Sequence, residues 1–135
     1  MKTHCPVKYS LEYIFIASPK RLYHYLSSEQ GLSEWFADKV ILKDNVFQFF
    51  WDGSAQKAVI SSKKENEFIQ FKWLDVEFNN YFEFKINTDS VCNEITLIIT
   101  DFALEDDFQD SKMVWNSAIN KMLRIIGGKL VNAPA

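Results

Sequence analysis

Residues 115–126, with the sequence WNSAINKMLRII, decide how the rest of this chain can fold. Trp115, Ile119, Met122 and Ile126 follow one another at spacings of four, three and four, which is the pattern of an amphipathic helix. Acidic residues precede the stretch and basic residues stand near its end, and this polarity complements a helix dipole. We therefore predict a C-terminal helix of about 20 residues with one apolar face.

The region before this helix alternates between apolar and polar side chains with the period of a β-strand. The predicted strands are separated by polar turns and cover residues 39–42, 46–51, 54–61, 68–74, 81–86 and 94–101. Asp52-Gly53 is the strongest hairpin signal and predicts a two-residue type I′ turn. Antiparallel strands joined by tight turns need a cover on one face, and only the C-terminal helix is long enough to provide it. We expect the sheet to curl around that helix.

The N-terminal segment adds one strand and two short helices. Val7 to Ile16 alternates as a strand, Ser18 suits a helix N-cap, and Pro19 suits the first helical position. A second short helix is predicted for residues 29–36. The fold class is thus α+β, with a curved antiparallel sheet of about seven strands on a long helix. The length of the chain fits a single domain over residues 1–135.

Composition excludes several classes of protein. The chain has 15 Lys and Arg against 18 Asp and Glu, and the basic residues form no cluster, which argues against a nucleic-acid partner. No apolar run approaches the length of about 18 residues that membrane insertion requires. The N-terminus lacks the apolar core of a signal peptide, so the expected location is cytoplasmic.

Residues suited to metal binding or nucleophilic catalysis are scarce. The histidines are His4 and His24, and the cysteines are Cys5 and Cys92, with no CxxC pair. Too few ligands stand at compatible spacing for a metal, and the chain lacks the glycines of a phosphate-binding loop. We predict no metal, no cofactor and two reduced thiols, and we assign no catalytic residue.

Acid–base catalysis by a carboxylate is the one catalytic role that the sequence leaves open. In the predicted register Glu83 faces outward, Asp52 forms a turn, and Asp101 ends the last strand. A carboxylate that faced a cavity would have its pKa raised by burial and could move a proton. The sequence favours a protein without enzymatic activity, but a catalytic role for one of these carboxylates stays open.

Aromatic residues make up 16% of the chain, and most of them fall on the inner faces of the predicted elements. The residues expected to line the space between sheet and helix are Tyr13, Trp35, Phe49, Trp51, Phe71, Trp73, Phe82, Phe84, Trp115, Ile119 and Met122. One interpretation is an apolar ligand pocket with a few polar anchors such as Tyr13 or Asn116. The other is a densely packed core, because large rings normally leave little space.

Several short motifs carry a resemblance that spans nearly the whole chain. They are Ile16-Ala17-Ser18-Pro19, Gly31-Leu32-x-x-Trp35, Trp35-Phe36-Ala37-Asp38, Phe49-x-Trp51-Asp52-Gly53-Ser54, Tyr81-Phe82-Glu83-Phe84 and Thr100-Asp101-Phe102-Ala103. With the order of elements, they resemble the START-like (SRPBCC) helix-grip superfamily. The early motifs look most like the branch related to the chaperone ATPase activator, and the others look like an uncharacterised bacterial START-like family.

The resemblance implies a fold and three candidate functions, because this superfamily includes lipid carriers, polyketide cyclases and chaperone activators. The first is a non-enzymatic binder of a hydrophobic small molecule or lipid. The second is a protein-interaction module, and the third is a small cyclase-like enzyme that uses a cavity carboxylate. The turn Lys43-Asp44-Asn45 lacks the glycine-rich loop of plant allergen-type members. We expect a monomer or a weak homodimer, because open sheet edges can pair.

Overall fold

The computed structural model describes residues 5–89 and 91–132, so His4 lies outside the described residues. It contains eight strands and three α-helices, with a short 3-10 turn at Glu105–Asp107. In chain order the elements are β1 (Val7–Ile16), α1 (Pro19–Ser27), α2 (Glu29–Trp35), β2 (Lys39–Lys43), β3 (Val46–Trp51), β4 (Ser54–Lys64), β5 (Phe68–Trp73), β6 (Tyr81–Thr88), β7 (Glu94–Ala103), α3 (Phe108–Ile126) and β8 (Lys129–Asn132).

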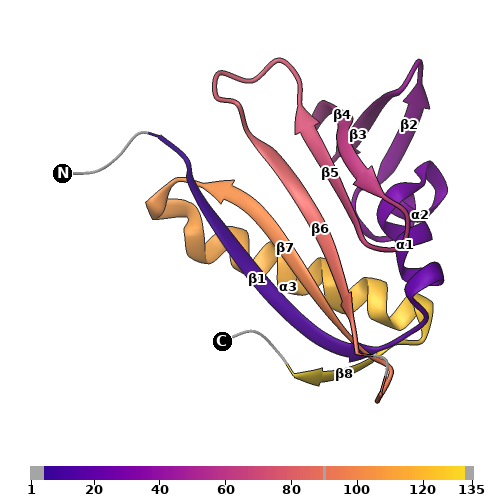
Figure 1. Ribbon diagram of the computed structural model, residues 1–135. Coiled ribbons are helices and arrows are strands. Elements are labelled where there is room, and N and C mark those ends of the chain that lie inside the picture. Colours follow the sequence, from indigo (N-terminus) through magenta and orange to yellow (C-terminus); the bar gives the residue numbers. More distant parts are fainter. Residues whose placement is uncertain (1–4, 90, 133–135) are drawn as a thin grey trace.

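All eight strands form one antiparallel sheet in the order β2-β3-β4-β5-β6-β7-β1-β8. The N-terminal strand β1 therefore lies inside the sheet, paired from Val7 opposite Ala103 to Ile16 opposite Glu94. The sheet curves, α3 lies along one of its faces, and α1 and α2 lie near the C-terminal end of α3 (Figure 1). The predicted α+β fold, with two short helices after the first strand, is confirmed.

The eighth strand follows directly from the way α3 ends. Gly127 adopts a left-handed conformation with φ of 72°, and its N–H bonds the Leu123 carbonyl. Such a residue reverses the chain at a helix C-terminus. The chain then runs back along β1, with Leu130 opposite Phe15. This short strand completes the sheet beyond the seven strands that the alternating pattern indicates.

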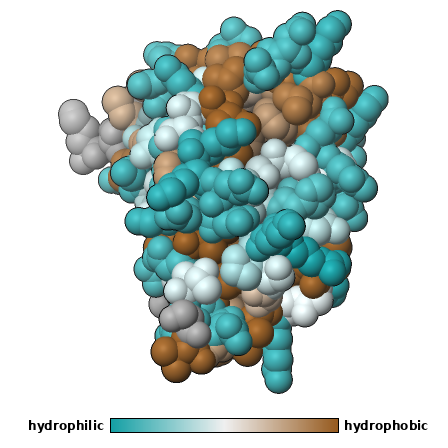
Figure 2. Space-filling model, turned by 45° about the vertical axis from the view of Figure 1, so that its right-hand side comes forward, coloured by the Kyte–Doolittle hydropathy of each residue, from teal (hydrophilic) through white to brown (hydrophobic). Residues whose placement is uncertain are grey.

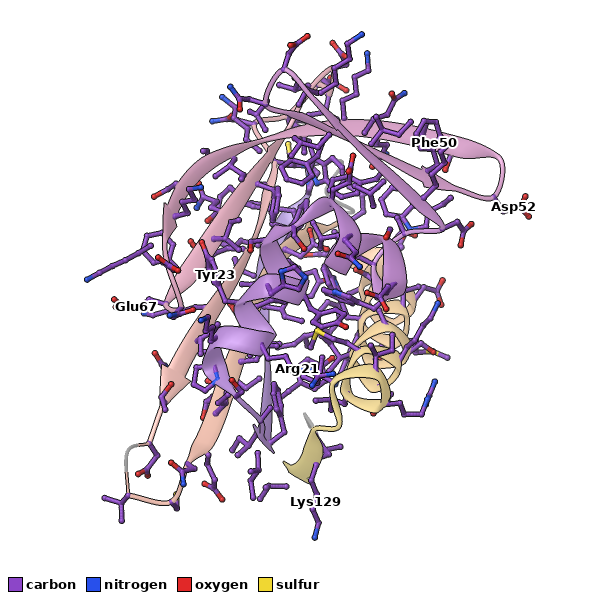
Figure 3. The ribbon with its side chains drawn as sticks, turned by 90° about the vertical axis from the view of Figure 1, so that its right-hand side faces the viewer. Arg21, Tyr23, Phe50, Asp52, Glu67 and Lys129 are labelled. Atoms are coloured by element: carbon purple, nitrogen blue, oxygen red, sulfur yellow. The ribbon has the colours of Figure 1, made fainter. Side chains whose placement is uncertain are left out.

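The prediction of a type I′ turn at Asp52-Gly53 is wrong. That turn type needs positive φ at both central residues, and here only Gly53 has it, at 79°. The positive pair occurs one hairpin earlier, at Asp44 with φ of 52° and Asn45 with φ of 66°. Asp52 stands at the outer tip of the β3–β4 hairpin (Figure 3).

The two short helices are fixed by serine caps. The Ser18 hydroxyl accepts a hydrogen bond from the Arg21 N–H at 3.3 Å, and Pro19 occupies the first turn, as predicted. The Ser28 hydroxyl accepts from the Gly31 N–H at 2.9 Å and begins α2. A Cβ at Gly31 would lie 2.6 Å from the Cα of Tyr25, so glycine allows α1 and α2 to pack closely. The chain then reaches Trp35 and Phe36, which pack against inward-facing rings of the sheet.

The long helix covers the inner face of the sheet with its apolar stripe. The buried residues of α3 are Trp115, Ile119, Met122, Leu123 and Ile126, which confirms the predicted stripe. They pack with the inward residues of the strands in one core. On the face that Figure 2 shows, polar side chains cover much of the surface, with apolar patches between them. Among the described residues, no helix is long and apolar enough to cross a membrane.

Candidate functional site

An aromatic cluster fills most of the space between the sheet and α3. Phe36, just after α2, is at its centre, with ring centroids 4.9 Å from Phe49, 5.1 Å from Phe82 and 5.9 Å from Trp115. Contacts at these distances are the stacked and edge-on arrangements that aromatic rings prefer. The rings therefore pack against one another here and do not enclose a large central cavity around Phe36.

A pocket of about 270 Å³ remains beside this cluster, beneath the N-terminal half of α3 and open to solvent. Its walls come from the end of α2, from β3, β5 and β7, and from α3. The lining residues are Phe36, Trp51, Trp73, Asp101, Ser111, Val114, Trp115 and Ala118. Most of them are aromatic or aliphatic, so the pocket suits an apolar ligand with one or two polar groups.

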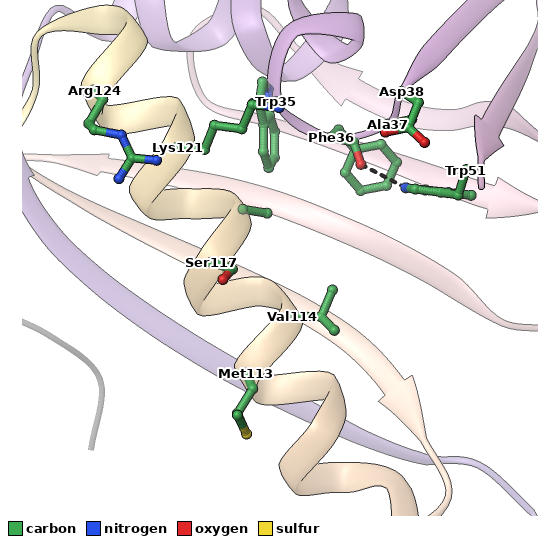
Figure 4. A pocket seen from close by; sticks show the side chains of 11 residues that line it. Trp35, Phe36, Ala37, Asp38, Trp51, Met113, Val114, Ser117, Lys121 and Arg124 are labelled. Atoms are coloured by element: carbon green, nitrogen blue, oxygen red, sulfur yellow. Dashed lines mark hydrogen bonds between the residues drawn. The ribbon is translucent and has the colours of Figure 1, made fainter.

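A wider, shallower groove of about 610 Å³ continues from this pocket along α3 (Figure 4). The two spaces share Phe36, Trp51, Val114 and Ala118. The groove is further lined by Trp35, Ala37, Asp38, Met113, Ser117, Lys121 and Arg124. The Trp51 indole N–H donates a 3.0 Å hydrogen bond to the Phe36 carbonyl, which fixes the wall opposite the helix.

Asp101 is the carboxylate of the pocket. Its Oδ2 accepts a 2.8 Å hydrogen bond from the Trp115 indole N–H, and its Oδ1 accepts from the Phe102 N–H at 2.7 Å. Burial raises the pKa of Asp101 above its ordinary value, although these hydrogen bonds act in the opposite direction. The expectation that Asp101 ends the last strand is wrong, because β7 continues to Ala103.

Two tyrosines of β1 connect the sheet to α3 beside the pocket. The Tyr9 hydroxyl bonds the Ser111 hydroxyl and lies 3.4 Å from Oδ2 of Asp101. The Tyr13 hydroxyl donates to Oδ1 of Asn116 at 2.5 Å. Burial raises the pKa of both tyrosines to about 12, so both stay neutral at ordinary pH.

The eleven residues predicted to line a cavity all come to the inner surface, but at different depths. Trp35, Trp51, Trp73 and Trp115 line the pocket or the groove. The others are buried in the core beneath it: Tyr13, Phe49, Phe71, Phe82, Phe84, Ile119 and Met122. A ligand contact remains a prediction for all of them.

Five pocket residues were not among those predicted from the sequence: Phe36, Asp101, Ser111, Val114 and Ala118. For Asp101 the necessary signal was present, because it shares strand parity with the buried residues Ile95, Leu97 and Ile99. Nothing comparable distinguishes Val114, which is 67% exposed at the pocket mouth.

Other candidate groups lie away from the pocket. His24 is exposed on α1 and packs edge-on against Tyr25 at 5.5 Å. Glu83 accepts a 3.1 Å hydrogen bond from Gln70 on the outer face of the sheet, as predicted. Among residues 5–89 and 91–132, no group of three or more metal-binding side chains lies close together.

A family model described as a START-like superfamily domain matches residues 4–128. The protein BfR322 from Bacteroides fragilis is 34% identical, with 98% of this chain and 96% of that chain covered and a TM-score of 0.64. Two more distant structures share the fold. The Aha1 dimer from Colwellia psychrerythraea is 16% identical over 89% of this chain and 93% of that chain, with a TM-score of 0.69. CalU16 from Micromonospora echinospora is 12% identical over 90% and 76%, with a TM-score of 0.66. No curated protein matches the chain.

Proposed function

The chain belongs to the START-like superfamily, and from that premise we propose that it is a non-enzymatic binding protein for a hydrophobic small molecule or lipid. The proposal treats residues 1–135 as one domain that acts in the cytoplasm as a monomer or weak homodimer. The observation that carries it is the apolar pocket of about 270 Å³ beneath α3, with Asp101 among its lining residues.

The size and chemistry of the pocket support a particular class of ligand. Pockets for small molecules usually measure about 300–1,000 Å³, so this one suits a compact ring system or a short chain. Trp51, Trp73 and Trp115 offer flat apolar surfaces to such a body. The carboxyl group of Asp101 offers the ligand a polar contact, and burial raises the pKa of this group above its ordinary value.

Native mass spectrometry of the full chain purified from its own host tests this proposal. We expect a retained small molecule that can be displaced by a neutral naphthyl probe, 2-(2-naphthyl)ethanol, with thermal stabilisation of the protein. Ala118→Phe should fill the pocket and abolish the shift, and Val114→Phe at the exposed mouth should weaken it. Asn120→Phe is the control, because Asn120 is exposed on the same helix and outside the lining residues. Apo protein alone, with no shift from a lipid and metabolite panel, would exclude the carrier role.

Asp101 supports a second candidate, a small cyclase-like enzyme. A carboxyl group whose pKa is raised in an apolar pocket suits proton transfer to a bound substrate. The test is to incubate the captured ligand with wild-type protein and with Asp101→Asn. Conversion by the wild type alone supports the enzyme, and an unchanged ligand in both samples contradicts it.

The remaining candidate, a protein-interaction module, is favoured by exposed apolar residues on α3. Met113 is 66% exposed and Val114 67% exposed beside the groove.

The expected oligomeric state is a monomer or a weak homodimer, and light scattering at micromolar concentration tests it directly. A mass near that of one chain, or a weak shift toward two, agrees with our expectation, whereas a stable tetramer contradicts it.

A further inference from the structure

We propose that the groove selects ligands that carry one anionic group, which Lys121 and Arg124 hold while the apolar body enters the pocket beneath α3. This inference rests on the proposed binding function and adds the chemical class of the ligand. Charge is unevenly distributed along the groove, because both of its cationic side chains, Lys121 and Arg124, stand toward the same end (Figure 4).

The helix sets the distance between the cations and the apolar pocket. Ala118 lines both the pocket and the groove, and Lys121 and Arg124 follow it by three and six positions. At about 1.5 Å of rise per residue, they lie about 4.5 and 9 Å further along the axis. An anionic group one or two bonds beyond a ring system in the pocket comes within reach of these long side chains.

The other charged groups fix the direction in which such a ligand lies. Asp101 is at the inner end, in the pocket. Asp38 lies across the groove beside Trp51, whereas Lys121 extends toward Trp35 and Arg124 stands at the far end (Figure 4). An anion is repelled near the carboxylates and attracted near the two cations. The ligand therefore lies with its apolar body in the pocket and its anionic group toward Lys121 and Arg124.

The cations suit a carboxylate or a phosphate. The guanidinium of Arg124 can donate two parallel hydrogen bonds to either group, and the Lys121 ammonium adds a point charge. The chemistry common to both ligands is an anionic oxygen pair on an apolar body, and the two are distinguished by separate arms of the test.

The test compares naphthyl probes with matched head groups by titration calorimetry on the full chain. The probes are 2-naphthylacetate, naphthylmethyl phosphonate, 2-(2-naphthyl)ethanol and 2-(2-naphthyl)ethylamine. We expect an anionic probe to bind about tenfold more tightly than the alcohol, with the difference shrinking as salt increases. The amine should bind more weakly than the anions. The tighter of the acetate and the phosphonate identifies the kind of head group.

Matched charge-removing variants locate the effect. Arg124→Gln and Lys121→Gln should each reduce the preference for the anion over the alcohol several-fold. Arg21→Gln on α1 and Lys129→Gln on β8 remove the same charges from exposed positions outside the groove and should change nothing (Figure 3). Equal binding of all four probes would overturn the inference and leave the binding function standing. An anion preference that survives in Arg124→Gln and Lys121→Gln would overturn it too, and no binding by any probe would contradict both proposals.

Discussion

The Trp115 indole N–H donates a 2.8 Å hydrogen bond to Oδ2 of Asp101 and so ties the middle of α3 to β7. Both residues also line the pocket. The Asp101 carboxyl group therefore attaches the helix to the sheet and is also exposed to a ligand in the pocket. Changes at Asp101 should act on the attachment of α3 and on the pocket together.

Replacing Asp101 with Asn should change how stability depends on pH. Because burial raises the pKa of Asp101 above 3.8, the folded state binds the proton more tightly than the unfolded state. This contribution to the free energy of unfolding is full below pH 3.8 and is lost as pH rises through the raised pKa. Urea titrations from about pH 3 to about pH 7 should therefore show wild type losing stability relative to Asp101→Asn. Asp52→Asn, in an exposed turn, controls for net charge. The prediction is refuted if wild type keeps or gains stability relative to Asp101→Asn as pH rises.

Replacing Phe36 with Ala should lower the free energy of unfolding by about 3 kcal/mol, because it removes the ring at the centre of the aromatic cluster. Its ring stacks on Phe82 at 5.1 Å and packs edge-on against Phe49 at 4.9 Å. Phe50→Ala is the control, since Phe50 lies beneath the Lys39 ammonium at 5.7 Å and outside the buried core (Figure 3). Chemical denaturation should give a clearly smaller loss for Phe50→Ala, and equal losses would contradict the central role of Phe36.

Two glycine substitutions should differ in cost for separate reasons. Gly127→Ala forces an L-residue to keep φ of 72°, which costs about 1 kcal/mol, although no atom lies within 4 Å of the new Cβ. At Gly31 the new Cβ would lie 2.6 Å from the Tyr25 Cα and 2.7 Å from the His24 carbonyl oxygen. Both are backbone atoms, so α1 and α2 must separate, and Gly31→Ala should cost about 2 kcal/mol or more. Thermal unfolding of the two variants would show the reverse order if the helices were loosely packed.

Tyr13→Phe should lower the free energy of unfolding by about 1 kcal/mol, because it removes the hydrogen bond to Asn116. A double-mutant cycle with Asn116→Ala isolates that bond from other effects. The two single losses should sum to more than the loss in the double variant. Strict additivity would mean that the hydroxyl contributes nothing to the attachment of α3.

The spacing of apolar residues predicts which segments are helices or strands and which face of each is buried. Phe82 and Phe84 alternate with outward polar residues and are buried as expected, and the α3 stripe packs on them. Local backbone geometry does not follow from this alternation. Asp44-Asn45 and Asp52-Gly53 both look like tight turns, and only the φ angles reveal which one has the type I′ pattern.

The pocket and the last strand depend on tertiary packing. Four residues at Lys129–Asn132 are too few for a recognisable alternation, and they form a strand only because β1 offers an open edge. The pocket exists because Phe36 fills one part of the space under α3 and leaves another open. Residue spacing alone does not predict which part of this space the aromatic rings fill and which part they leave empty.

The inner position of β1 has a consequence for synthesis of the chain. Tyr9 faces Asp101, 92 positions later, so the first strand has no partner in the sheet until β7 is made. At about 5–20 residues per second, the ribosome takes roughly 5–20 s to cover that interval. Hairpins from β2 to β6 can form during this delay, while an apolar N-terminal segment stays unpaired. Nascent chains of this protein should therefore be most vulnerable to aggregation just before β7 emerges.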